Sequence, residues 1–252
     1  MSNKPDIEAL LAPLPEEGRP VGNAIATRRS VRGFKQDPVP QATIEAILAL
    51  AARAPSGSNI QPWKVYVVAG PRRDAIASAV LTAFDTEQGQ HTEPYRYYPR
   101  DWREPYISRR RATGWGLYGT LGIAKEDKAR MRAQQRENFT FFGAPVGLFF
   151  AIDDDMEKGS WLDFGMFLQT IMIAARGFGL DTCPQQAWSH YHRVVGPMIG
   201  MAASEILVCG MSLGHIDDTA PANAFWTSRE AVAQFASFMG FDGHEGEHTP
   251  GS

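Results

Sequence analysis

The sequence predicts an α+β protein, in which helices are combined with a few strands. Segments with the helical spacing of apolar residues alternate only loosely with segments that have the character of strands. The strand segments are short and rich in Val, Ile, Leu, Phe and Tyr. No linker or internal repeat divides the elements, so a single folded domain is expected.

The first helix is expected over residues 41–53. Ile44 and Ile47 belong there to a helical pattern, and Pro55 ends it because proline disfavours the helical conformation of the residue before it. Residues 63–69 follow as the first strand, because apolar and polar residues alternate in them.

A second helix is expected over residues 71–84, followed by a long loop over 85–105. This loop contains Pro94, Pro99, three tyrosines and Trp102. Loops of that length in compact domains are usually functional or disordered. Its aromatic side chains are therefore candidates for a binding surface.

Two further strands and two further helices complete the expected elements. Residues 145–152 and 205–211 are expected to form strands, and the first of these is apolar enough to be buried. Residues 161–176 form a helix whose apolar surface continues nearly all round, which is typical of the centre of a core or of a subunit interface. A short helix is expected over 229–239.

Composition indicates an ordinary globular protein. The chain has 252 residues, 44% of them hydrophobic and 21% charged. A net charge of -3 and a pI near 6.1 give no reason to expect nucleic acid or an anionic membrane as a partner. No apolar run approaches the roughly 20 residues that span a bilayer, and the N-terminus lacks the pattern of a signal peptide. A cytoplasmic location is expected.

Three parts of the chain are expected from local composition. Residues 1–20 are rich in Pro, Glu and Gly and form an N-terminal arm. Residues 21–241 form the folded domain, and residues 242–252 a disordered tail.

Two segments carry the candidate chemistry. Residues 26–34 place three arginines and a serine within five positions, which suits a phosphorylated ligand because arginine presents a planar fork of donors that stays charged. Residues 54–63 form a polar turn, in which backbone N–H groups and the amides of Asn59 and Gln61 could bind a flat heterocycle. Each segment alone is common in proteins, but the two together, separated by about one helix, are not.

Three motifs, in this order along the chain, resemble those of the nitroreductase family of FMN-dependent, NAD(P)H-using oxidoreductases. They are Arg28-Arg29-Ser30-x-Arg32-x-Phe34, Pro55-Ser56-x-x-Asn59-x-Gln61-Pro62-Trp63 and Gly179-Leu180-Asp181-x-x-Pro184. The likeness extends from about residue 22 to about residue 241. Trp102-x-Glu104-Pro105-Tyr106, with arginines at 109–111, resembles the nitrobenzoate-reductase-like branch.

The resemblance implies a more definite fold and assembly. It implies a small mixed central sheet flanked by helices, with the long helix over 161–176 at the interface of an obligate homodimer. Residues 55–59 would come from the other subunit, which makes each active site a shared property of the dimer. NAD(P)H and a nitroaromatic substrate would use the same face of the flavin in turn, in a ping-pong cycle.

The resemblance also implies which residues bind FMN. Arg28, Ser30 and Arg229 would hold the phosphate, Arg32 would lie near N1 and O2 of the flavin, and the backbone of 184–187 would face the ring, with an N–H near N5. The full set is Arg28, Arg29, Ser30, Arg32, Pro55, Ser56, Gly57, Asn59, Asp163, Pro184, Gln185, Gln186, Ala187 and Arg229. Because flavin N5 carries the hydride, no side chain is expected to be catalytic.

Three positions depart from the pattern of the family. Gly57 stands where many members have Ser, Ala187 where Gly is common, and Thr227 where Lys can occur. These departures concern the number of phosphate contacts and the residue that donates to N5, and not the flavin itself.

Four aromatic residues are expected to bind the substrate: Trp102, Tyr106, Trp115 and Tyr118. Together with the arginines at 109–111 they suit a flat, electron-poor ring that bears nitro or carboxylate groups. Other tasks on the same fold stay open, namely the reduction of enones, quinones or halophenols, or flavin binding without catalysis.

Two other motifs indicate different classes of protein. Residues 114–119 fit G-x-G-x-x-G, but no strand precedes them, so a glycine-bearing helix is expected there. Residues 210–214 fit G-x-S-x-G after a strand and would make Ser212 the nucleophile of a hydrolase. That class needs a helix directly after the serine, and residues 215–221 are a poor start for one.

No metal site and no disulfide framework are expected. His190 and His192 have no supporting set of ligands, and residues 153–155 are expected to form a solvated turn. Cys183 and Cys209 form no CxxC, and Cys183 is expected to be a small packing residue.

Overall fold

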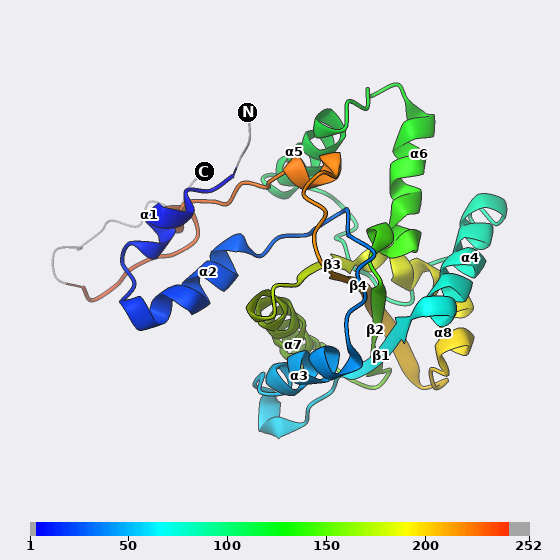
Figure 1. Ribbon diagram of the computed structural model, residues 1–252, viewed down its shortest axis with the longest axis horizontal. Coiled ribbons are helices and arrows are strands. Elements are labelled where there is room, and N and C mark those ends of the chain that lie inside the picture. The colour runs from blue at the N-terminus through cyan, green and yellow to red at the C-terminus, as the bar shows by residue number, and fades with distance from the viewer. Residues whose placement is uncertain (1–3, 242–252) are drawn as a thin grey trace.

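A four-stranded sheet forms the centre of the computed structural model, which describes residues 4–241 (Figure 1). Its strands are β1 (Lys64–Ala69), β2 (Val146–Asp153), β3 (Asp181–Gln185) and β4 (Glu205–Gly214), in the spatial order β1-β2-β4-β3. All neighbouring strands pair antiparallel, and within residues 4–241 the parallel component is one isolated bridge between Ser30 and Thr182. The expected α+β class is confirmed, as are the three expected strands.

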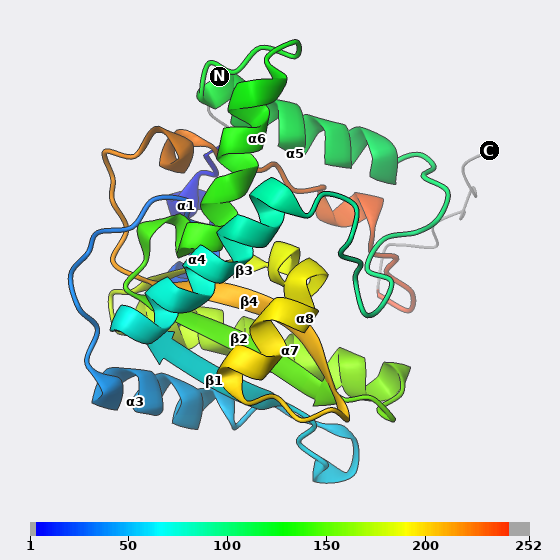
Figure 2. The same cartoon turned by 90° about the vertical axis from the view of Figure 1, so that its right-hand side faces the viewer.

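Helices cover both faces of the sheet. The α-helices within residues 4–241 are α1 (Ile7–Leu11), α2 (Arg19–Thr27), α3 (Gln41–Ala51), α4 (Gly70–Thr86), α5 (Tyr106–Thr120), α6 (Lys128–Arg136), α7 (Lys158–Gly177) and α8 (His192–Ile199). α3 and α7 lie on one face, and α4 and α8 on the other (Figures 1 and 2). α3, α4 and α7 confirm the helices expected over 41–53, 71–84 and 161–176. None of the helices described combines the length and the apolar character needed to cross a bilayer.

α7 supplies much of the core on its side of the sheet. Phe164, Phe167 and Ile171 are buried against the strands, and Trp63 stacks on Phe167 with ring centroids 4.5 Å apart. Fully burying an apolar side chain of this size contributes roughly 1.5–3 kcal/mol. The opposite side of α7 is apolar but uncovered, since Leu162 is 73% exposed. The core role expected of this helix is therefore seen on one side of it, and a role at a subunit interface stays a prediction.

An aromatic cluster fills the other face of the sheet. The ring of Trp188 is fully buried, stacks on Phe141 at 4.4 Å and meets Phe149 edge to face at 5.1 Å. Two glycines in the strands make room for these rings. A Cβ on Gly210 would overlap Trp188, and a Cβ on Gly147 would overlap Phe141.

The long loop expected over 85–105 contains no helix or strand after the end of α4. It is fastened to the core at two points. The His91 ring contacts the buried Tyr191 ring, with centroids 4.8 Å apart, and the Tyr95 hydroxyl lies 2.8 Å from Gln186 Oε1. The second contact links this loop to the segment that follows β3.

Two local expectations differ from the structure. The helix expected over 229–239 is wrong, because only a 3-10 turn forms there, over Val232–Gln234. Its apolar side chains meet no core, and Phe235 is 72% exposed.

The sequence gives no strand signal for β3, which contains Pro184. Proline is tolerated there because β3 lies at an edge of the sheet. α5 confirms the glycine-bearing helix expected at 114–119.

The N-terminal helices lie to one side of the body formed by the sheet and its covering helices (Figure 1). The arm expected over 1–20 contains α1, and α2 begins within it at Arg19. The boundaries of arm, domain and tail remain predictions. Residues 1–3 and the tail expected over 242–252 lie outside the described residues.

Polar side chains form a charge cluster at one end of the sheet. Glu205 Oε1 lies 2.9 Å from Lys64 Nζ, and Glu205 Oε2 accepts from the Tyr66 hydroxyl at 2.5 Å. Burial raises the pKa of Glu205, but hydrogen bonds from Tyr66, Lys64 and the Ala202 N–H outweigh it. The resulting pKa lies below the ordinary value of 4.5.

We expect Glu205→Gln to lower stability at neutral pH and to lose this effect in acid. Because the folded-state pKa is depressed, the stabilisation is present above the unfolded-state pKa and is lost as the pH falls through the folded-state pKa. Urea unfolding between about pH 7 and pH 3 should show the free energies of unfolding of variant and wild type converging. Glu126→Gln, at an exposed site, is the control. A difference in the free energy of unfolding between Glu205→Gln and wild type that does not change with pH would contradict this role of Glu205.

Candidate functional site

A cavity of about 830 Å³ opens between the segment that follows α2 and the segment 225–229. It gathers the arginines and the serine of the first motif with the late arginine: Arg28, Arg29, Ser30, Arg32 and Arg229. Thr227 and Ser228 add two hydroxyls, and none of the described residues that line it is acidic. A concave site with this set of donors fits a phosphate group.

Arg28 and Arg229 place two positive charges near each other at this cavity. The pKa of Arg28 is lowered, chiefly because its guanidinium is partly buried and also because of the charge of Arg229, while Cys183 acts in the opposite direction. Arginine nevertheless stays protonated at neutral pH. An anion bound between the two guanidinium groups would relieve their repulsion, so the pair favours an anionic ligand.

Arg29 joins the two walls of the cavity. Its guanidinium donates to the backbone carbonyl of Asn223 and lies 4.3 Å from the centre of the Trp226 ring. The Asn223 side chain accepts from the Arg32 N–H at 2.7 Å and donates to the Gly33 carbonyl at 2.9 Å. Sequence reasoning missed Asn223, because no local pattern marks a residue that is 191 positions from its partner.

A buried carboxylate lies behind Arg29. Asp181 is 4% exposed, and its Oδ1 accepts from Arg176 Nη1 at 2.8 Å. Burial raises the pKa of Asp181, while the charges of Arg176 and Arg29 act against this rise. The aspartate of the third motif therefore balances the charge of Arg29 and helps to hold it.

The first motif is held beside β3. Ser30 forms the bridge to Thr182, and the Val31 N–H donates to the Thr182 carbonyl at 3.0 Å. This pairing sets the direction of the segment and so brings its arginines to the cavity. Cys183 is buried, which raises the pKa of its thiol to about 11, and it acts as the packing residue that was expected.

The second motif forms a tight turn beside α7 and does not line the arginine cavity of the same chain. The Gly57 N–H donates to the buried Asp163 Oδ2 at 3.0 Å, and the Gln61 N–H donates to Ser56 Oγ at 3.1 Å. Asn59 adopts a left-handed backbone conformation with φ of 57°. The residues of the expected second half-site therefore lie together at the start of α7: Pro55, Ser56, Gly57, Asn59 and Asp163.

The segment expected to face a flat ring joins β3 to the 3-10 helix that follows it: Pro184, Gln185, Gln186 and Ala187. The buried Gln185 side chain accepts from Ser212 Oγ at 2.7 Å and donates to the Asn138 carbonyl at 2.6 Å. The Gln186 side chain is bound to Tyr95. Both amides are thus committed within the protein, and the backbone is the part of this segment that could serve a ligand.

The hydrolase interpretation is wrong. Ser212 lies inside β4, which continues to Gly214, and its side chain is fully buried. A nucleophile elbow instead exposes its serine at a sharp turn between a strand and a helix. Ser212 is a structural residue that orients Gln185.

The aromatic residues expected to bind the substrate lie on α5 or just before it: Trp102, Tyr106, Trp115 and Tyr118. The guanidinium of Arg103 lies 4.9 Å from the centre of the Tyr106 ring, and that of Arg110 lies 4.7 Å from the Trp102 ring. Trp115 and Tyr118 meet edge to face at 5.9 Å. The rings and cations on this surface contact one another, and their role toward a substrate stays a prediction.

α5 lies next to the arginine cavity, although none of its residues is buried. Phe225 packs against Gly116, where a Cβ would overlap its ring, and Thr113 lines the cavity directly. A smaller cavity of about 480 Å³ adjoins the first and is bordered by the ion pair between Arg109 and Glu230, 3.1 Å apart. A ligand at the arginines would therefore have α5 as a neighbour.

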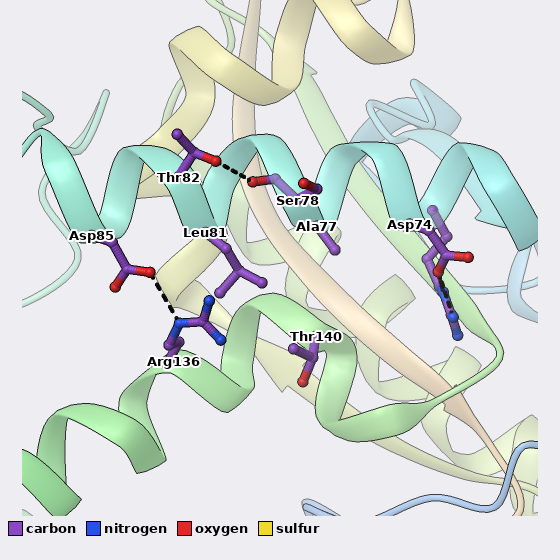
Figure 3. A pocket seen from close by; sticks show the side chains of 9 residues that line it. Asp74, Ala77, Ser78, Leu81, Thr82, Asp85, Arg136 and Thr140 are labelled. Carbon is purple, nitrogen blue, oxygen red and sulfur yellow. Dashed lines mark hydrogen bonds and ion pairs between the residues drawn. The ribbon is translucent and has the colours of Figure 1, made fainter.

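A further cavity lies between α4 and the segment 136–140, away from the motifs (Figure 3). Its charged side chains are already paired, since Arg136 donates to Asp85 at 3.2 Å and Arg73 to Asp74 at 2.6 Å. It contains none of the expected site residues. Within residues 4–241, no group of His, Cys, Asp or Glu side chains could hold a metal ion.

An α+β fold with an arginine-lined cavity beside an edge strand is suited to a phosphate-bearing ligand. Residues 25–215 match the model of the nitroreductase family. The chain therefore belongs to the nitroreductase family, and the expectation drawn from its motifs is confirmed.

Two named relatives match this chain over nearly all of their own length. A 4-nitrobenzoate reductase of Pseudomonas putida is 39% identical over 86% of this chain and 95% of the relative. A nitrobenzene nitroreductase of Ectopseudomonas oleovorans is 37% identical over 87% of this chain and 96% of the relative.

Solved structures show the same fold. The FMN and NADPH-dependent nitroreductase NfnB from Sphigopyxis sp. strain HMH is 39% identical, with a TM-score of 0.85 over 88% of this chain and 99% of that one. The FMN-dependent nitroreductase NfnB of Mycobacterium smegmatis, solved in complex with NADPH, is 33% identical, with a TM-score of 0.85 over 89% of this chain and all of that one.

Proposed function

We propose that this protein is an FMN-dependent oxidoreductase that reduces nitroaromatic compounds with NAD(P)H in a ping-pong cycle. The observation that carries the proposal is the cavity that joins Arg28, Ser30 and Arg229 in a member of the nitroreductase family. The names of the relatives support nitroarenes as substrates, and those of the solved neighbours support FMN and NADPH.

The residues present fit FMN. Arg28, Arg229 and the Ser30 hydroxyl would hold the phosphate, and Arg32 would lie at the pyrimidine edge of the ring. The backbone of 184–187 would orient the ring, since the side chains of Gln185 and Gln186 are bound within the protein. FMN, when bound, supplies the chemistry of accepting and donating a hydride. The protein then has to bind the cofactor and the substrate, orient them toward each other and exclude water from the site.

One experiment tests the activity. The purified protein should show flavin absorbance, NADPH or NADH should bleach it under anaerobic conditions, and 4-nitrobenzoate or nitrobenzene should restore it. Protein that neither contains nor takes up FMN would contradict the flavin assignment. Flavin that is reduced but reoxidised by quinones, enones or halophenols alone would contradict the substrate assignment.

A homodimer with shared sites is part of the proposal. Leu162 and Met166 form an exposed apolar strip on α7, and the turn over 55–59 lies at the same helix, held by Asp163. Exposed contiguous apolar surface is typical of an interface. A second copy that covers this strip would bring its own turn over 55–59 toward the arginine cavity of the first copy.

We expect Leu162→Asp to dissociate the dimer and to release FMN with it, because the substitution places a charge in the proposed interface. Sedimentation velocity should shift from the mass of two chains to that of one, with loss of flavin absorbance. Ala75→Asp, on the exposed surface of α4, is the control and should change neither property. A wild-type protein that sediments as a flavin-loaded monomer would contradict shared sites.

Replacing Trp102, Tyr106, Trp115 or Tyr118 singly by Ala should slow reoxidation by nitroarenes and leave reduction by NAD(P)H nearly unchanged. Each stacking contact with an electron-poor ring contributes roughly 0.5–1.5 kcal/mol, about two- to tenfold. Stopped-flow measurement of both half-reactions checks this. If all four variants are reoxidised by nitroarenes at the rate of wild type, the residues that select the substrate lie outside α5 and the segment just before it.

A further inference from the structure

Tyr95 points into the protein from a loop whose other tyrosines are exposed. In this loop, over 85–105, Tyr97 is 53% exposed and Tyr98 is 47% exposed. The Tyr95 side chain is instead half-buried, and its ring packs on Trp161 of α7 with ring centroids 4.5 Å apart. This contact fixes the middle of the loop against the helix.

The Tyr95 hydroxyl has two acceptor oxygens within hydrogen-bonding distance. It lies 2.8 Å from Gln186 Oε1 and 2.6 Å from the carbonyl oxygen of Val208 on β4. Because a phenol carries one proton, the hydroxyl donates to one of these acceptors at a time. Burial raises the pKa of Tyr95, so the hydroxyl keeps this proton at neutral pH and remains a donor.

Both ends of the Gln186 side-chain amide have partners. Gln186 Nε2 donates to Ser189 Oγ at 2.7 Å, and the fully buried Ser189 hydroxyl donates to the Gln186 carbonyl at 2.9 Å. Gln186 Oε1 is the atom that accepts from Tyr95. Removing the Tyr95 hydroxyl would take this partner from the amide oxygen, and a polar group that loses its partner away from water costs free energy.

Two successive glutamines anchor the segment 184–187 to different parts of the protein. Gln185 is bound to Ser212 of β4, so its anchor belongs to the sheet. Gln186 is bound to Tyr95, so its anchor belongs to the loop. The orientation of the backbone that joins the two glutamines therefore depends on the loop as well as on the sheet.

We infer that Tyr95 is a positioning residue, whose hydroxyl acts through Gln186 to hold the backbone of 184–187 in the orientation in which it would face the flavin ring. This inference rests on the proposed function. Tyr95 is not among the described residues that line the arginine cavity, so its effect should fall on the ring of the cofactor and not on the phosphate.

The test measures the binding of FMN, and of riboflavin, which has the same ring and no phosphate, by quenching of flavin fluorescence. Tyr95→Phe keeps the ring that packs on Trp161 and removes the hydroxyl. We expect it to weaken the binding of both flavins by the same factor, about two- to tenfold, the range of one hydrogen bond. The visible circular dichroism of the bound flavin should decrease, because this signal depends on how the protein holds the ring.

A second variant tests whether Tyr95 acts through Gln186. Gln186→Met removes the amide and keeps an unbranched side chain. Tyr95→Phe is made alone and in this background, and in the Gln186→Met background it should change neither the flavin affinity nor the circular dichroism any further. An equal effect of Tyr95→Phe in both backgrounds would overturn the inference.

Tyr191→Phe is the matched control, because it removes the hydroxyl of a buried tyrosine that packs on Phe139 on the face of the sheet opposite α7. It should bind both flavins as wild type does. The positioning role would be overturned if Tyr95→Phe behaved as this control, weakened FMN alone, or lowered affinity without a change in circular dichroism. Wild-type protein that binds neither flavin would instead overturn the proposed function itself.

Discussion

Replacing Arg28 by Ala is expected to weaken FMN binding by about ten- to hundredfold, since a charge-assisted hydrogen bond contributes roughly 1.5–3 kcal/mol. Arg28 lies in the cavity with Ser30 and Arg229, and partial burial increases the strength of its interaction with an anion. Riboflavin affinity should change much less, because riboflavin carries no phosphate.

The measurement is a fluorescence titration of each flavin, repeated at low and high salt. The affinity of the variant for FMN should depend less on salt than that of wild type, because one charge contact is lost. Arg136→Ala is the control, since this arginine is paired with Asp85 at another cavity. Equal FMN affinity in both variants would place the phosphate elsewhere.

Replacing Trp188 by Ala is expected to lower the free energy of unfolding by about 3–5 kcal/mol, the usual cost of truncating a buried aromatic residue. The ring is fully buried and contacts Phe141, Phe149 and Phe139. The cavity left behind cannot be refilled easily, because three rigid rings surround it.

Trp188→Ala should also affect the candidate flavin site. Trp188 directly follows Ala187, so its packing anchors the segment whose backbone is proposed to face the flavin. Urea unfolding gives the stability, and flavin absorbance after dialysis gives the retention. Trp115→Ala, at a ring 39% exposed, is the control for losing a tryptophan and should cost far less stability. A loss below about 1 kcal/mol for Trp188→Ala would contradict the packing argument.

The elements that the sequence predicts correctly are those with a strong local pattern. α3 and α7 repeat apolar residues at helical spacing, and β1, β2 and β4 are short segments rich in apolar and aromatic residues. β3 has no such pattern, since Pro184 interrupts it, and only its pairing with β4 makes it a strand. The segment 229–239 has apolar residues but no surface to bury them against, and it stays largely irregular.

The candidate site likewise has residues that the sequence predicts and residues that it does not. The arginines of the first motif are neighbours in the chain, so their gathering at one place is a local property that the sequence shows directly. In the sequence, only the resemblance to the family points to Arg229, and the structure brings it to the same cavity as Arg28. Asn223 and Trp226, which hold Arg29, carry no signal of their own because their partners are almost two hundred residues away.

By itself, the sequence determined the α+β class, the phosphate-binding motif and membership of the nitroreductase family, because each depends on residues close together or in a fixed order. Only the tertiary structure decided that Ser212 is a buried strand residue and that the turn over 55–59 lies at α7, outside the arginine cavity of its own chain. It also brought Tyr95 to Gln186. These are contacts between segments far apart in the chain, and they are set by how α2, α7 and β3 pack together, which no local pattern specifies.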